Sequence, residues 1–411
     1  MKKFLALVSI ICFCCAFIQP GFAADNSGAY EKLFSAETEA SEIEAMFAKS
    51  FLKVVPVEKI CEISKVYTST LGSFKQADSS SSPIKLVFEN GSCLSTIGFD
   101  SQGKINTLWF GAPELQKDSL AEVLKLFEEL EDQVSICLTR NDKEVLIDKL
   151  SEKPLAIGSA FKLFILEALV AQIKAGERSW SDIIRIENEW KSFPSGILQE
   201  WPAGSQLTLE SVANLMISLS DNTATDHLFN LIGREELRRY FPKTCNPPFN
   251  TFEMFKLKIF FPAEGEKFIN AEEKEKEKIL NDLGAISTGQ IASSSIIYGW
   301  KTPKMIDSLE WHITTRELCR TIFKLKNCKA IQINPATGLV DKKDWNLVGF
   351  KGGSEPGVLN YTWVLQRKND PDFYCLSCTA NNSEKEVDSS KFNVAVARLL
   401  KLVQAKNLDA H

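Results

Sequence analysis

Residues 158–170 read GSAFKLFILEALV and place a Ser-x-x-Lys pattern directly before a strongly apolar segment. A serine and a lysine three positions apart lie on one face of a helix, so this spacing lets the Ser159 hydroxyl reach the Lys162 amine. Serine is a weak nucleophile at neutral pH and needs a neighbouring base. Lysine can be that base only where burial or nearby positive charge lowers its pKa. The stretch therefore predicts an activated serine at the start of a long helix.

The Ser-x-x-Lys pattern alone is weak evidence, because most such pairs lie on solvated helix surfaces. Two further motifs follow it in the chain. Residues 216–224 read MISLSDNTA, with Ser-Asp-Asn at 220–222, and residues 349–353 read GFKGG on an expected strand. Each has a structural alternative. Ser220 is a good N-cap for the next helix, Lys351 could protect a strand edge, and two glycines can mark a close backbone approach.

Composition points to an ordinary soluble globular protein. The chain has 411 residues, of which 44% are hydrophobic and 25% are charged. Its net charge of −5 offers no basic field for nucleic acid. The three histidines lack metal-ligand spacing, so we expect neither a metal site nor a cofactor.

The first residues read as a signal peptide. Lys2 and Lys3 precede an apolar stretch at 4–18, and small residues surround a cleavage site before Ala24. The apolar run is short for a membrane span, although a single membrane anchor is the alternative. We therefore expect residues 1–23 to be removed and the protein to be exported, either periplasmic or secreted, with no membrane contact afterwards.

Eight cysteines lie beyond this leader: Cys61, Cys93, Cys137, Cys245, Cys319, Cys328, Cys375 and Cys378. An oxidising compartment permits disulfides. The favoured pair is Cys61–Cys93, and the second candidate is Cys319–Cys328. The Cys-x-x-Cys pattern at 375–378 sits in a strand-like run, where alternation places the two sulfurs on opposite faces. Buried or unpaired thiols are therefore expected there in preference to a redox motif.

The remaining pattern divides the chain into two domains. Residues 24–116 predict a small α+β domain, a helix packed on an antiparallel sheet. Residues 117–411 predict a larger domain with a helix capped by Asp118, a strand pair, a helical middle, three more strands and a closing helix. Expected strands are 85–88, 93–99, 104–110, 134–138, 144–148, 348–351, 361–366 and 373–379; expected helices include 39–52, 118–130, 208–217, 224–232, 270–283, 314–325 and 391–404.

The order of these elements and motifs over about residues 117–405 resembles the serine β-lactamase and penicillin-binding-protein superfamily, and is most similar to its class A branch. The resemblance implies an α/β sandwich: a five-stranded antiparallel sheet with helices on both faces and an all-helical lobe. The two-domain layout also resembles that of a protein of the clavulanic acid biosynthesis cluster, which implies a steroid-isomerase-like first domain.

The resemblance also implies roles for site residues. The nucleophile would be Ser159, with Lys162 accepting or relaying its proton and Ser220 passing a proton to the leaving group. The substrate-binding residues would be Asn222, Gly353 and Ser354, with Lys351 supplying positive charge. The backbone N–H groups of Ser159 and Ser354 would form the oxyanion hole, which stabilises charge that develops in the transition state. Asp221 would be a buried structural residue.

Two departures from the family pattern concern substrate binding and deacylation. Gly352 stands where the family usually has a Thr or Ser hydroxyl, and we expect Ser354 to replace that hydroxyl in part. No Glu-x-x-Leu-Asn motif follows the Ser-Asp-Asn motif, so the glutamate that clears the acyl-enzyme in class A enzymes is not evident. Glu253 is the candidate deacylation base, and a surface helix position is the alternative. Acylation could then proceed while deacylation is slow.

Three functions remain open at this point. The first is a serine hydrolase acting through an acyl-enzyme, with β-lactam hydrolysis as the expected reaction. The second is a penicillin-binding-type peptidase or esterase with slow deacylation. The third is a non-catalytic binding protein with this fold, favoured by the Lys-Gly-Gly motif. The expected partner is a small β-lactam, ester or peptide-like substrate. The protein is expected to be a monomer.

Overall fold

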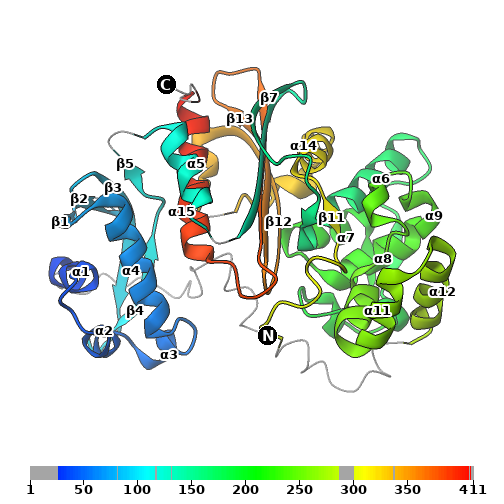
Figure 1. The fold of residues 1–411 in the computed structure, drawn as a ribbon, viewed down its shortest axis with the longest axis horizontal. Coiled ribbons are helices and arrows are strands. Elements are labelled where there is room, and N and C mark those ends of the chain that lie inside the picture. Colours follow the sequence, from blue (N-terminus) through cyan, green and yellow to red (C-terminus); the bar gives the residue numbers. More distant parts are fainter. Residues whose placement is uncertain are drawn as a thin grey trace. The chain divides into compact units, whose positions relative to one another are not determined.

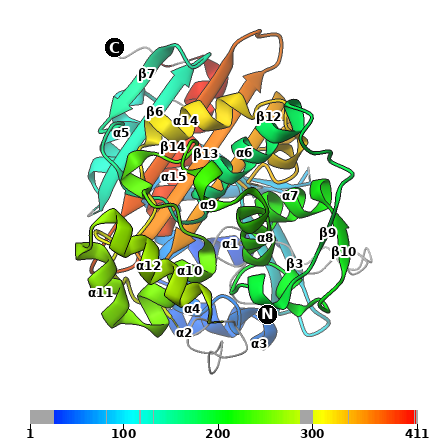
Figure 2. The ribbon, with the colours of Figure 1, turned by 90° about the vertical axis from the view of Figure 1, so that its right-hand side faces the viewer.

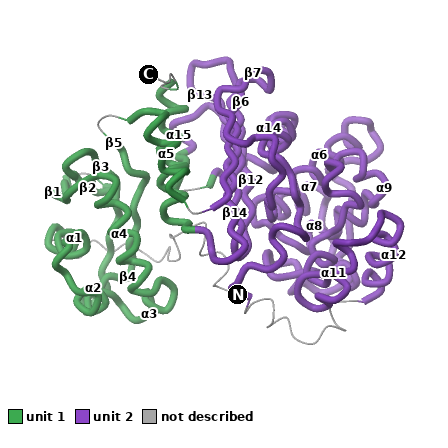
Figure 3. The backbone as a smooth tube through the Cα atoms, in the orientation of Figure 1, with its two compact units in different colours: residues 1–130, 336–341, 388–411 green, residues 131–335, 342–387 purple. Residues whose placement is uncertain are grey.

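The chain divides into two compact units in the computed structural model (Figure 3). The model describes residues 26–80, 82–115, 118–130, 132–286, 300–336, 338–406 and 408. Unit 1 comprises residues 1–130, 336–341 and 388–411, and unit 2 comprises residues 131–335 and 342–387. This division differs from the expected one at 116/117, because residues 117–130, 336–341 and 388–411 belong to unit 1. The expected domain boundaries stay a prediction, and the expected signal peptide lies outside the described residues.

Unit 1 begins with four helices and a five-stranded antiparallel sheet (Figure 1). The strand order is β1-β2-β3-β4, with β5 paired to β3. Tyr30 and Phe88 lie in the core between helices and sheet, and Phe34 packs edge-on against Phe88. The steroid-isomerase-like identity of this part stays a prediction. The elements are α1 (Asn26–Phe34), α2 (Ala40–Met46), α3 (Lys49–Leu52), α4 (Val57–Leu71), β1 (Phe74–Asp78), β2 (Ile84–Phe88), β3 (Gly91–Phe99), β4 (Ile105–Phe110) and β5 (Glu114–Leu115).

The expected helix at 39–52 is interrupted. Phe47 has extended backbone angles and forms a parallel bridge with Ile105. The Ala48 N–H donates to the Ile105 carbonyl at 2.9 Å, so its donor is used by the sheet and not by a helix. Pairing with a distant strand thus overrides the helical periodicity of the segment, which becomes the two short helices α2 and α3.

Two more helices complete unit 1: α5 (Leu120–Glu128) and α15 (Ser389–Ala405). Ser119 caps α5 through a reciprocal capping box with Glu122. The expectation that Asp118 is the cap is wrong. Its carboxylate accepts from Arg398 of α15 at 2.6 and 2.9 Å. This bidentate pair joins α15 to the residue that precedes the cap of α5.

Unit 2 contains the expected five-stranded antiparallel sheet, in the order β12-β13-β14-β6-β7. Strand β12 lies at one edge and pairs only with β13. Helix α14 packs on β6, β13 and β14 (Figure 2). The bounds are β6 (Gln133–Arg140), β7 (Glu144–Lys149), β12 (Trp345–Glu355), β13 (Val358–Arg367), β14 (Phe373–Asn381) and α14 (Thr315–Lys324).

The rest of unit 2 is mainly helical, as expected, and gathers beside the sheet (Figure 1). Helix α6 is buried along most of its length, because Leu163 to Leu166 are all 2% exposed or less. Four short strands make two small ladders, β8 with β11 and β9 with β10. The elements are β8 (Leu155–Ala156), the 3₁₀ turn η2 (Gly158–Phe161), α6 (Lys162–Lys174), β9 (Ile183–Arg185), β10 (Gln206–Thr208), α7 (Leu209–Ser218), α8 (Asn222–Ile232), α9 (Arg234–Leu237), α10 (Thr251–Phe255), the π-helix η6 (Lys256–Phe260), α11 (Pro262–Asn270), α12 (Glu273–Gly284) and β11 (His312–Ile313).

The eight cysteines of the described residues are free thiols, so neither expected disulfide is present. Cys319 points into the sheet side of α14, where its Sγ donates to the Cys137 carbonyl at 3.5 Å and to the Cys375 carbonyl at 3.4 Å. It therefore faces strands β6 and β14 and makes no bond with Cys328. Cys375 and Cys378 are both fully buried, as expected for structural thiols in a sheet.

Candidate active site

The turn that carries Ser159 packs directly on strand β12. Gly158 has φ +50°, a conformation that favours glycine. A Cβ on Gly158 would lie 3.1 Å from the Ser354 nitrogen. A Cβ on Gly353 would lie 2.0 Å from the Ile157 oxygen and 2.6 Å from the Ser159 nitrogen. No side chain separates the two segments, and the backbone nitrogens of Ser159 and Ser354 both lie at this contact.

Lys162 is fully buried at the start of α6 and faces the Ser-Asp-Asn motif. Its Nζ donates to the Ser220 carbonyl at 2.7 Å, to the Ser220 hydroxyl at 3.1 Å and to Asn222 Oδ1 at 2.6 Å. Burial lowers the pKa of Lys162 to about 7, against the raising effect of the Asp221 and Asp226 charges. A large fraction of this amine is therefore neutral near pH 7 and able to accept a proton.

Lys351 brings a second amine to the same hydroxyl. Its Nζ donates to Ser220 Oγ at 3.1 Å and to the Gly352 carbonyl. Burial, and then the charge of Lys162, hold the pKa of Lys351 well below its ordinary value. Ser220 itself has φ +55°, an uncommon conformation for a residue with a side chain. The Ser195 hydroxyl donates to the Ser220 carbonyl at 2.7 Å and supports that turn.

Asp221 is the N-cap of α8, so the alternative in which Ser220 caps this helix is wrong. One carboxylate oxygen accepts from the Ala224 N–H at 2.8 Å. The other accepts from the Ile197 and Leu198 N–H groups at 2.6 and 3.0 Å. Asp221 is fully buried and joins the loop before it to the motif. It is thus structural, as expected.

Asn222 lies between Lys162 and the neighbouring loop. Its Oδ1 accepts from Lys162, and its Nδ2 donates to the Phe193 carbonyl at 3.0 Å. The Asn222 N–H also donates to the Ser195 carbonyl at 3.0 Å. These three bonds fix the side-chain amide, which in turn orients the Lys162 amine toward Ser220.

Glu253 lies in the first turn of α10. It is buried, and its Oε2 accepts from the Asn250 N–H at 2.8 Å in a capping box at the start of α10. Arg234 donates to its Oε1 at 2.5 Å. Both oxygens are therefore engaged in contacts within the fold. The alternative of a surface helix position is wrong, whereas the role of deacylation base stays a prediction.

Asp226 is a buried carboxylate that sequence reasoning missed. It accepts from the Thr251 N–H at 2.9 Å, the Thr251 hydroxyl at 2.6 Å and the Phe252 N–H at 2.9 Å. Burial raises the pKa of Asp226 to about 7. Its position four residues after Asn222, one turn along α8, was the available signal. Asp226 holds the start of α10 against the site, because the Thr251 hydroxyl also contacts the Asn222 carbonyl at 3.4 Å.

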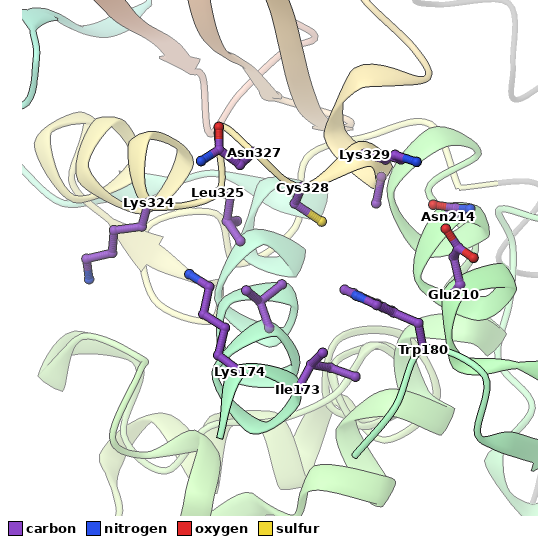
Figure 4. A pocket seen from close by; sticks show the side chains of 12 residues that line it. Ile173, Lys174, Trp180, Glu210, Asn214, Lys324, Leu325, Asn327, Cys328 and Lys329 are labelled. Carbon is purple, nitrogen blue, oxygen red and sulfur yellow. The ribbon is translucent and has the colours of Figure 1, made fainter. Parts of the chain in front are cut away.

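A cavity of about 340 Å³ lies at the opposite end of α6 (Figure 4). Ile173 and Lys174 line one side, and Trp180 and Cys328 line others, with the Cys328 sulfur directed inward. None of the predicted site residues lines this cavity. Lys174 is twelve residues beyond Lys162, which corresponds to about 18 Å along a helix. The cavity is thus separate from the candidate active site.

The described part of the chain holds no group of three or more His, Cys, Asp or Glu arranged to bind a metal ion. In the same part, no helix is long and apolar enough to cross a membrane.

Residues 117–276 match the model of the β-lactamase enzyme family. This segment contains Ser159, Lys162 and the Ser-Asp-Asn motif, but it ends before Lys351. No curated protein matched the chain. The match confirms the resemblance of this region to serine β-lactamases, and the mixed α+β architecture agrees with that fold.

Solved structures similar to the chain include several β-lactamases. The β-lactamase from Francisella tularensis is 14% identical, with 70% of this chain and 98% of that chain covered and a TM-score of 0.49. The β-lactamase from Sphaerobacter thermophilus is 16% identical, with 69% and 94% covered and a TM-score of 0.45. PBP-A is 14% identical, with 71% and 98% covered and a TM-score of 0.43.

Proposed function

We propose that this chain, whose residues 117–276 form a serine β-lactamase-like region, is a serine hydrolase in which Ser159 forms an acyl-enzyme with a β-lactam. The observation that carries the proposal is the buried Lys162 amine, with a pKa of about 7, one turn after Ser159. Ser220 and Asn222 hold this amine by three hydrogen bonds. A base whose pKa lies near the working pH is the most effective partner for a serine nucleophile.

Acylation begins when neutral Lys162 accepts the hydroxyl proton of Ser159 as its Oγ attacks the carbonyl carbon. The carbonyl oxygen becomes an oxyanion, toward which the N–H groups of Ser159 and Ser354 donate. The C–N bond of the lactam then breaks, and Ser220 gives its proton to the leaving nitrogen. Lys162 and Lys351 both contact the Ser220 hydroxyl, so either amine can return a proton to it.

Slow release of the acyl group is the second part of the proposal. Arg234 and the Asn250 N–H engage the two oxygens of Glu253, which weighs against this carboxylate as the base that activates water. This engagement favours the second candidate function, a penicillin-binding-type peptidase or esterase, in which a β-lactam is held as a long-lived adduct.

Trapping by intact-mass spectrometry tests the nucleophile. The protein is mixed with a penicillin, a cephalosporin and an activated ester, in parallel with Ser159→Ala and with Ser181→Ala at an exposed control serine. The wild type and Ser181→Ala should gain the mass of one ligand, and Ser159→Ala should not. An adduct that persists for hours indicates the peptidase or esterase type, and one lost within seconds indicates a β-lactamase. Absence of any adduct in the wild type would refute acyl-enzyme chemistry.

We also propose export of the protein. The charged start, the apolar stretch at 4–18 and the small residues before Ala24 support it. Expression of the full chain in a bacterium, followed by fractionation, should yield periplasmic or secreted protein. Its mass should be that of a chain that begins at Ala24. Full-length protein confined to the cytoplasm would contradict this proposal.

A further inference from the structure

We infer that the buried cluster of Lys258, Glu310 and Glu355 positions the end of strand β12, and with it the Ser354 N–H of the oxyanion hole. The inference rests on the proposed function. The side chains of Lys258 and Glu310 are fully buried, and that of Glu355 is 8% exposed. The Lys258 Nζ donates to Glu310 Oε1 and, at 2.5 Å, to Glu355 Oε1.

The three members come from three separate segments of unit 2. Lys258 lies in the π-helix η6, Glu310 lies just before β11, and Glu355 is the last residue of β12. The cluster therefore ties both ends of the segment 258–310, which also carries α11 and α12, to the strand that carries Lys351. π-Helices are rare, and where they occur they often mark functional sites.

Alternation places Glu355 on the nucleophile's side of β12. Residues 351, 353 and 355 share one face of a strand. Lys351 on this face contacts Ser220, and Gly353 contacts the turn of Ser159. Glu355 follows Ser354 directly, so a displacement of its side chain acts on the donor next to it.

The end of β12 needs such support, because β12 is the edge strand of its sheet. Its final ladder pair, Glu355 with Val358, closes the hairpin to β13. Among the described residues, no strand pairs with the other side of β12. Packing against η2 and the ion pair with Lys258 support this side of β12 in place of a neighbouring strand.

Glu310 also connects the cluster to the turn of the nucleophile. Its Oε2 accepts from the Trp311 N–H at 3.2 Å. The Trp311 ring stacks on Phe161 of η2, with ring centroids 3.8 Å apart. The cluster thus reaches both segments of the expected oxyanion hole, β12 through Glu355 and η2 through Glu310 and Trp311.

The charges explain why Lys258 is needed. The Lys258 ammonium faces two carboxyl groups in a dry site. Burial, followed by the Glu310 charge, raises the pKa of Glu355 well above its ordinary value, so the pair does not carry two full charges. Buried ion clusters stabilise a fold weakly at best, whereas removal of one partner leaves an uncompensated charge. Without Lys258, the charge that remains on this carboxyl pair would be buried without a counter-ion, and the end of β12 would move.

The test compares Lys258→Met with Lys256→Met. Lys256 is a buried lysine of the same π-helix, but it donates to the Leu283 carbonyl and does not reach β12. Acylation of Ser159 by a β-lactam is followed by intact mass over a range of ligand concentrations, well below the unfolding temperature. Lys258→Met should slow acylation at saturating ligand about 100-fold, the effect of losing one oxyanion donor. Ligand affinity should change less than about 3-fold, and Lys256→Met should acylate normally.

A second pair of variants keeps the test valid if Lys258→Met does not fold. Glu355→Gln retains an acceptor for Lys258, whereas Glu355→Met has similar length and no acceptor. Glu355→Met should slow acylation and Glu355→Gln should not. Equal rates in all folded variants, with only the unfolding temperature lowered, would overturn the inference and leave the cluster a purely structural role.

Hydrogen exchange separates this inference from the proposed function. Amides at 351–355 should exchange faster in Lys258→Met than in the wild type or Lys256→Met. If the wild type forms no adduct, the proposed function fails, and the exchange rates still decide whether Lys258 holds the strand. Unchanged exchange at 351–355 would overturn the inference in either case.

Discussion

Replacement of Lys162 by Met should stabilise the protein at pH 6 and destabilise it at pH 9. A fall of the Lys162 pKa from 10.5 to about 7 corresponds to about 5 kcal/mol, at ~1.4 kcal/mol per unit. Below pH 7, Lys162 is charged in both states, and the folded state carries this full penalty. Between about pH 7 and 10.5, the unfolded state binds the proton and the folded state does not, so stability rises with pH by ~1.4 kcal/mol per unit.

The hydrogen bonds of Lys162 oppose this gain. Loss of its three bonds to Ser220 and Asn222 removes about 3 kcal/mol, at ~1 kcal/mol each. Lys162→Met should therefore be more stable than the wild type by about 2 kcal/mol at pH 6. At pH 9 the wild type has recovered most of its penalty, so the variant should be less stable by about 1 kcal/mol.

Urea unfolding followed by fluorescence at pH 6, 7.5 and 9 measures this difference. Lys174→Met, at the exposed end of the same helix, is the control and should follow the wild type at every pH. A stability difference between Lys162→Met and the wild type that does not change with pH would refute the reasoning. It would mean that Lys162 keeps its charge in the fold and cannot serve as the base for Ser159.

Three further substitutions follow from the site. Gly353→Ala should abolish adduct formation and lower the unfolding temperature, because its Cβ would lie 2.0 Å from a backbone oxygen, whereas Gly284→Ala in open space on α12 should be neutral or mildly stabilising. Asp221→Ala should lower the free energy of unfolding in urea by about 3 kcal/mol or more, because three backbone donors lose their acceptor. Asp388, the N-cap of α15, provides the comparison: Asp388→Ala should lower the same free energy by about 1 kcal/mol. Glu253→Gln should leave the release rate of the acyl-enzyme unchanged by mass spectrometry; a fall of tenfold or more would identify Glu253 as the deacylation base.

Much of the fold could be predicted because local patterns and final pairings agree. The strands expected at 93–99 and 373–379 are β3 and β14, where alternation and turns leave little choice. The helix expected at 39–52 fails because Phe47 and Ala48 bond to Ile105, more than fifty residues away. Helical periodicity carries no information about such a distant partner.

The candidate site divides in the same way. Ser159, Lys162 and Ser220 stand in short motifs with fixed spacing, and the structure brings Lys162 to Ser220. The cap at Asp221 could not be told from one at Ser220, because both side chains suit the role and only the loop at 196–198 decides. The prediction of Glu253 as the deacylation base rests only on its position in the chain. Its pairing with Arg234 depends on tertiary packing, which the sequence pattern does not reveal.

The Lys258 cluster had no sequence signal. Its members are separated by about fifty residues on each side, and lysines and glutamates are abundant throughout this region. A buried ion cluster forms only when folding brings such residues together and excludes water. Nothing in the sequence distinguishes the buried Lys258 from the exposed Lys274 and Lys278 of α12.

The contact between Gly158 and Gly353 limits how this site can evolve. The two backbones meet with no room for a side chain, so the geometry of the expected oxyanion hole belongs to the main chain. Mutation can alter side chains around it, as the glycine at position 352 illustrates, while the spacing of the donors stays constant. Changes in substrate preference are thus accessible by single substitutions at the rim, whereas the two glycines should be nearly invariant among functional descendants of this chain.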